Sequence, residues 1–135
     1  MSLVQDLLDL MAMTFRRLCE AAGSPEGASG VRNLFTDPTA YDAWAEAWRR
    51  RLADDGTGTV HERMSVMRAA NPAVIPRNHL VEEAISAAVN NSDFAPFENL
   101  IAVLARPYED VPATLARYEV PPRSDQIVRQ TFCGT

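Results

Sequence analysis

The sequence contains no lysine: all thirteen cationic side chains are arginine, against eighteen acidic ones, and the formal net charge is −5. An acidic domain is a poor candidate for nucleic-acid binding, because contacts to phosphates require a basic surface. The one basic cluster, Arg49-Arg50-Arg51, directly follows Trp48. Cations are favourable at the carboxyl end of a helix, so we interpret this cluster as a solvated helix end.

Long hydrophobic runs are also lacking. No stretch of about 20 apolar residues occurs, so the sequence predicts no membrane-spanning helix. The residues Met1–Leu3 are not a basic segment leading into an apolar one, so they do not resemble a signal peptide, and we interpret them as a cloning scar. Cysteine is scarce, with Cys19 and Cys133 the two in the chain. Two cysteines cannot build the disulfide framework of a small secreted domain, which favours a reducing compartment.

Helical periodicity, by contrast, is present almost throughout. Apolar residues recur at three- and four-residue steps, as at Val4, Leu7, Leu8, Met11, Phe15 and Leu18, and again at Leu80, Val81, Ala84, Ile85 and Ala88. No stretch alternates apolar and polar residues for long enough to indicate a strand. The pattern predicts an all-α fold, an irregular bundle of about five helices followed by an extended, proline-rich tail over 121–135.

Several helix boundaries can be predicted from their end residues. Asp37-Pro38 predicts a helix start, with Asp as the cap and Pro at the first helical position. Thr59 and Glu62 have the spacing of a capping box. Asn71-Pro72 predicts a break, because the residue before a proline avoids helical geometry. The stretch 24–30 is rich in Gly, Ser and Pro, which predicts a loop.

The stretches that could bind phosphate or metal are incomplete. The glycines of 24–30 match neither phosphate-binding spacing, and no strand precedes them. His61-Glu62 does not complete the HExxH zinc motif, because Ser65 stands where the second histidine is needed. We therefore expect no metal ligand in this chain and an exposed His61.

Two tryptophans and one cysteine in the first half of the chain are further candidates for a functional role. Trp44 and Trp48 share one helical face, and we interpret them as core anchors rather than as a platform that stacks a ligand. We interpret Cys19 as a quiet helical thiol. Taken alone, the sequence predicts an acidic helical domain with no visible active site.

Short motifs lie in a fixed order along the chain, beginning with Met67-Arg68, Asn71-Pro72 and Arg77-Asn78. Further segments are Thr14–Leu18, Tyr41–Trp44, Phe97-Glu98, Leu104–Tyr108, Ala116–Tyr118, Pro121-Pro122 and Thr131–Thr135. In order and spacing these segments resemble the selenoprotein O family of bacterial YdiU type. The resemblance covers nearly the whole chain. It departs from the family in two places: the segment around residues 11–14 is shorter than the usual spacing of the family, and residues 24–30 have no counterpart in it.

The resemblance implies that residues 4–120 form the helical C-terminal domain of a protein adenylyltransferase, with 121–135 as its tail. By resemblance, the whole protein binds ATP with Mg or Mn on a kinase-like fold. It transfers AMP to Ser, Thr or Tyr hydroxyls of protein substrates in the bacterial cytoplasm. The nucleotide and metal residues of the family lie upstream, so we expect no catalytic, cofactor or metal residue here and an inactive fragment. The implied partners are the missing catalytic domain and the protein substrates, not nucleic acid or a membrane.

The resemblance singles out Cys133 as a redox candidate. Eukaryotic members of the family place selenocysteine third from the C-terminus, and Cys133 is third from the end of this chain. We hypothesise a reversible disulfide between Cys133 and a thiol of the missing domain or of a partner, with Cys19 as a local alternative. The competing interpretation is a free thiol without a role.

Arg77-Asn78 has two interpretations. In the structural one, Asn78 caps a helix and Arg77 pairs with a carboxylate or a backbone carbonyl. In the functional one, both residues dock against the kinase-like domain.

Two rival functions remain open. One is a stand-alone helical interaction module, with a homodimer formed through an apolar stripe. An exposed face around Trp44 and Trp48 would favour that module. The other is a small thiol-dependent enzyme that uses Cys133, which is the weaker because no base or helix start is near this cysteine.

Overall fold

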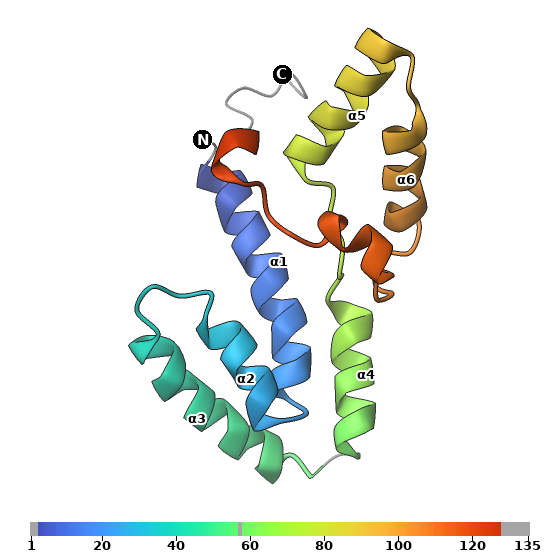
Figure 1. Ribbon diagram of the computed structural model, residues 1–135. Helices are drawn as coiled ribbons and strands as arrows, with labels where there is room; N and C mark the ends of the chain where they lie inside the picture. The colour runs from blue at the N-terminus through green and yellow to red at the C-terminus, as the bar shows by residue number, and fades with distance from the viewer. Residues whose placement is uncertain (1–2, 57, 128–135) are drawn as a thin grey trace. The chain divides into compact units, whose positions relative to one another are not determined.

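The computed structural model describes residues 3–56 and 58–127, and within them it contains helices and turns but no strand (Figure 1). The elements are α1 (Leu3–Ala21), α2 (Pro25–Arg32), α3 (Thr39–Asp54), α4 (Val60–Ala70), α5 (Asn78–Asn91), α6 (Ala95–Leu104) and the 3-10 helices η1 (Ala113–Tyr118) and η2 (Ser124–Gln126). The predicted all-α class is confirmed. The chain divides into two compact units, one of residues up to Asp9 and from Pro72 onward, the other of Leu10–Asn71.

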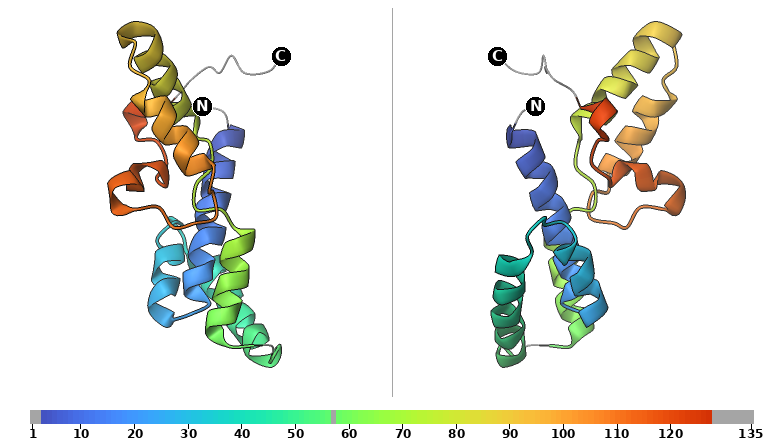
Figure 2. Two further views of the ribbon diagram at one scale, coloured as in Figure 1. Left: turned by 90° about the vertical axis from the view of Figure 1, so that its right-hand side faces the viewer. Right: turned by 60° about the vertical axis from the view of Figure 1, so that its left-hand side comes forward.

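The second unit has a core to which the first three helices contribute. Its buried members are Leu18 and Ala21 of α1, Ala28 and Val31 of α2, and Tyr41 and Ala45 of α3. Met67 of α4 and Trp48 of α3 pack against this cluster from its margin. Within this unit α4 lies beside α1 in both figures (Figures 1 and 2), and the Arg16 guanidinium donates to the Asn71 carbonyl at 3.0 Å.

The first unit is organised around the hairpin of α5 and α6, which lie side by side (Figures 1 and 2). The turn between them passes through Ser92, whose φ of 54° lies in the left-handed region. The core of the unit consists of Ala73, Val74, Leu80, Leu100, Val103 and Tyr118. The Ala73 and Val74 amides both donate to the Pro107 carbonyl, at 2.7 and 3.2 Å, which fixes the segment before α5 against the turn that follows α6.

Two of the predicted helix boundaries agree with the structure, and a third is displaced by one residue. The capping box at α4 is confirmed, since the Thr59 hydroxyl accepts from the Glu62 amide at 3.2 Å and the Glu62 carboxylate accepts from the Thr59 amide at 2.6 Å. Helix α4 ends at Ala70, as the Asn71-Pro72 break predicts. The start of α3 was predicted one residue too early, because Pro38 occupies the cap position and the helix begins at Thr39.

The predicted loop over 24–30 is wrong: most of this stretch belongs to α2. Ser24 caps the helix by accepting from the Gly27 amide at 3.1 Å, and Pro25 stands in the first turn, where its missing N–H has no cost. Ala28 and Val31 are then buried against the core of the second unit. Burial of these apolar side chains outweighs the poor helix propensity of the glycines.

The part of the predicted tail that the structure describes is not wholly extended, because Ser124–Gln126 forms a single 3-10 turn. Residues 128–135, including Cys133, lie outside the described residues. Among the described helices, none combines the length and the apolar character that crossing a bilayer requires.

The two glycines of α2 provide a matched pair of substitutions. A Cβ at Gly27 would overlap the Glu20 carbonyl and lie 2.8 Å from the Ala21 amide nitrogen, whereas a Cβ at Gly30 would meet nothing closer than Arg17 Cδ at 3.9 Å. We expect Gly27→Ala to lower the free energy of unfolding by about 1–3 kcal/mol through overpacking. Gly30→Ala should raise it by about 0.4–1 kcal/mol, because it restricts the unfolded chain. Urea denaturation of both variants measures the difference, and equal effects would contradict the close approach at Gly27.

Candidate functional site

The most deeply buried charge described in the chain is the guanidinium of Arg77, in the first unit. Its side chain is 1% exposed, and its Nη1 lies 2.6 Å from Asp9 Oδ1. Its Nη2 donates to the Glu119 carbonyl at 3.0 Å. Burial lowers the pKa of Arg77, and the Asp9 carboxylate opposes that shift. The predicted pairing of Arg77 with a carboxylate or a backbone carbonyl is confirmed, and both kinds of partner are present.

The predicted cap at Asn78 is wrong. Helix α5 begins at Asn78, the cap position is occupied by Arg77, and neither side chain makes a capping hydrogen bond. Asn78 itself is half-buried. That Arg77 and Asn78 dock another domain stays a prediction, and the burial of Arg77 restricts direct contact to Asn78.

His79 lies close enough to this ion pair to interact electrostatically with both of its members. His79 is 8% exposed, and its Nδ1 has no hydrogen-bond partner among the described residues. Burial lowers the pKa of the imidazole, and the Arg77 guanidinium lowers it further, while the Asp9 and Glu83 carboxylates act in the opposite direction. The surroundings of Arg77 therefore favour the neutral form of the His79 imidazole.

Cys19 is a buried thiol of the second unit, with 0% exposure. Its Sγ donates to the Phe15 carbonyl at 3.4 Å, and burial raises the pKa of the thiol. A protonated, inaccessible thiol is a poor nucleophile, so the structure supports the interpretation of a quiet helical thiol. The other candidate, Cys133, lies outside the described residues.

Aromatic rings form a ladder that begins at Phe35, in the segment before α3, and continues along one side of α3. Ring centroids are 5.7 Å apart from Phe35 to Tyr41, 6.0 Å from Tyr41 to Trp44 and 5.4 Å from Trp44 to Trp48. Trp48 packs against the core, as predicted for an anchor. Trp44 is 46% exposed, so its prediction as a core anchor is wrong, and its ring serves to cover Trp48 instead.

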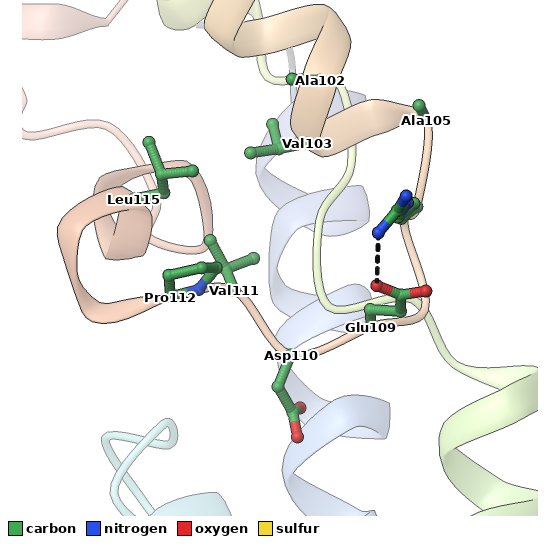
Figure 3. Close-up of a pocket in the computed structure, with 9 residues that line it drawn as sticks. Ala102, Val103, Ala105, Glu109, Asp110, Val111, Pro112 and Leu115 are labelled. Atoms are coloured by element: carbon green, nitrogen blue, oxygen red, sulfur yellow. Dashed lines mark ion pairs between the residues drawn. The ribbon is translucent and has the colours of Figure 1, made fainter.

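A cleft of about 530 Å³ lies beside the end of α6 (Figure 3). Its lining consists of Ala102, Val103, Ala105, Arg106, Glu109, Asp110, Val111, Pro112 and Leu115. Arg106 is the one cation of this lining, and its Nη1 lies 3.7 Å from Glu109 Oε2, the pair marked in the figure. Two carboxylates against one engaged cation disfavour a bare phosphate in this cleft.

The described part of the chain contains no cluster of side chains that could form a metal site. No group of three or more His, Cys, Asp or Glu side chains is placed there to hold an ion. His61 is exposed, as predicted. The most deeply buried charged groups of the described residues are those around Arg77.

Comparison with known proteins identifies the family of this chain. The profile of the family described as "Protein adenylyltransferase SelO" matches residues 7–105. A protein of Methylorubrum extorquens (strain PA1), named "Protein nucleotidyltransferase YdiU", is 54% identical over 147 residues, covering 99% of this chain and 29% of that protein. A protein of the same name from Bradyrhizobium sp. (strain BTAi1 / ATCC BAA-1182) is 56% identical over 140 residues, covering 98% and 28%. The chain thus spans less than a third of these relatives.

Removing one member of the buried ion pair should be costly. We expect Arg77→Met to lower the free energy of unfolding by about 3–5 kcal/mol, because it removes the guanidinium that lies 2.6 Å from the buried Asp9 carboxylate. The matched control is Arg106→Met, which breaks an exposed pair and should cost less than about 1 kcal/mol. Denaturant titration of the two variants measures both values. A loss at Arg77 no greater than the loss at Arg106 would show that the pair is not closed to water.

The buried imidazole should make stability depend on pH. The folded chain holds the pKa of His79 below its unfolded value of about 6.5, so the unfolded state binds more protons in this range. The contribution of His79 to the free energy of unfolding is therefore complete above about pH 6.5. It is lost as the pH falls toward the pKa of His79 in the folded chain. His79→Gln should flatten the fall in unfolding free energy between about pH 7 and about pH 5. The exposed His61→Gln is the control and should keep the parent profile; identical profiles for both variants would refute the assignment.

Proposed function

The chain belongs to the SelO family of protein adenylyltransferases, and from this membership we propose that it is the C-terminal accessory region of a protein nucleotidyltransferase. The observation that carries the proposal is a mismatch of lengths. The alignments include 98–99% of this chain but 28–29% of the relatives. The nucleotide-binding and catalytic groups are therefore assigned to the rest of the protein, and the 135-residue chain alone should be inactive.

In the proposed reaction, a Ser, Thr or Tyr hydroxyl of a protein substrate attacks the α-phosphorus of ATP. A bond forms between the hydroxyl oxygen and phosphorus, the bond to the β-phosphate bridge breaks, and pyrophosphate leaves while the hydroxyl proton passes to a base. Mg or Mn would neutralise the phosphate charge. The chain described above supplies none of these groups; its role is to complete the catalytic fold.

The full-length protein from the source genome provides the test. With ATP labelled in the α-phosphate, we expect label on protein acceptors, whereas label in the γ-phosphate should be released with pyrophosphate. Phosphate transfer would show the reverse pattern. The four nucleoside triphosphates, compared in parallel, identify the nucleotide. The 135-residue chain should transfer nothing, and transfer by the chain alone would contradict its accessory role.

We propose in addition that Cys133 forms a reversible disulfide with a thiol of the catalytic part or of a partner. The two thiols give up two electrons and two protons to a disulfide oxidant, which is reduced to two thiols. Cys19 is not the favoured partner, because it is buried and its pKa is raised.

The thiol proposal is tested by counting free thiols of the full-length protein after treatment with oxidised glutathione. We expect two thiols to be lost in the parent and in Cys19→Ser, and none in Cys133→Ser. Peptide mapping identifies the bonded pair. Thiols that all remain free under the oxidant would overturn the disulfide.

A second candidate function is a stand-alone interaction module, which the half-exposed Trp44 favours. In that case the aromatic ladder of α3 would bind a second copy of the chain. Sedimentation of the chain and of Trp44→Ser discriminates the two candidates. Association that is lost in the variant supports the module, and a monomeric chain at all concentrations removes it.

A further inference from the structure

Helix α6 is apolar on almost every side. Of its ten residues, Glu98 is the one charged side chain and Asn99 the one other polar side chain. A helix that is hydrophobic all round is typical of an element covered on both faces, whereas a helix at a protein surface carries a polar outer face. The sequence of α6 is thus suited to an interior position.

The structure covers only the inner side of this helix. Leu100 and Val103 are 6% and 8% exposed and belong to the core of the first unit. On the outer side, Phe94 at the cap position, Phe97 and Ile101 are 57%, 49% and 52% exposed. Their spacing of three and four residues places these three side chains on one stripe, which we call the outer stripe of α6.

Helix α5 of the same hairpin repeats this feature on a smaller scale. Ile85 and Val89, four residues apart, are 49% and 76% exposed. Five large apolar side chains on one hairpin exceed the scattered exposure of single residues that ordinary surfaces show.

We propose that the outer stripe of α6 is the surface on which the catalytic part of the same polypeptide docks. This inference rests on the proposed function. The stripe lies within residues 7–105, the segment that matches the family profile. More than two thirds of the length of the relatives lies outside the alignment and can supply the covering surface.

The size of the stripe favours a tethered partner over a second copy of the chain. A stable complex between separate proteins buries about 1,200–2,000 Å² in total, more than a stripe of three side chains provides. Contacts between domains of one chain succeed with about 600–1,500 Å², because the connecting chain keeps the effective concentration high.

Photo-crosslinking in the full-length protein tests the docking surface directly. A photoreactive phenylalanine analogue replaces Ile101 in one variant and Asn99 in the other; Asn99 is exposed and lies on a different side of α6. We expect crosslinks from position 101 to peptides that precede this chain in the polypeptide, and none from position 99. Crosslinks from position 101 that join two molecules, that remain within the 135 residues, or that do not form at all would each overturn the proposal.

A second variant tests the docking surface without the photoreactive analogue. Ile101→Asp should lower the thermal unfolding midpoint of the full-length protein by several degrees, because it places a charge in a covered interface. Asn99→Asp adds the same charge at the control position and should leave the midpoint unchanged; equal shifts would overturn the docking surface. Nucleotide transfer, measured on the same preparations, separates the two ideas. Crosslinks without any transfer support docking and refute the activity, and transfer without crosslinks does the opposite.

Discussion

A guanidinium and a carboxylate lie in a space nearly closed to water in the first unit, where the side chains of Arg77 and Asp9 are 1% and 7% exposed. Removing both charges from water costs several kcal/mol each, and attraction in this environment offsets that cost only at short range. Their separation of 2.6 Å supplies this attraction, and Arg77 also donates to the Glu119 carbonyl, while its Nε has no hydrogen-bond partner among the described residues. Three segments distant in sequence must therefore reach their places together.

Local signals made much of the helical fold predictable, and the errors arose where packing decides. The Thr59 capping box and the break at Asn71 depend on neighbouring residues, and both agree with the structure. The segment 24–30 was taken for a loop because of its glycines. Ser24 and Pro25 form a helix start in this segment, and Val31, which is fully buried against the core, stabilises the helix that follows.

The environment of Arg77 shows that the partners of a buried residue are also hard to predict from the sequence. A single sequence indicated that this arginine needs a carboxylate or a carbonyl, since the chemistry of the side chain demands one. It did not indicate Asp9, which is distant in sequence, or the burial of His79 beside the ion pair. Long-range pairs leave no periodic trace, so the type of interaction could be predicted and its members could not.

Several of the polar groups that the structure buries pair with one another or with the backbone. Arg77 and Asp9 neutralise each other, and the Cys19 thiol donates to a helix carbonyl. A catalytic centre needs polar groups that converge on open space, and the cleft beside α6 instead combines an apolar lining with carboxylates. Outward, α6 presents Phe97 and Ile101, side chains that water stabilises poorly. Inward charges and an outward apolar stripe are thus combined in a chain that spans less than a third of the relatives it matches.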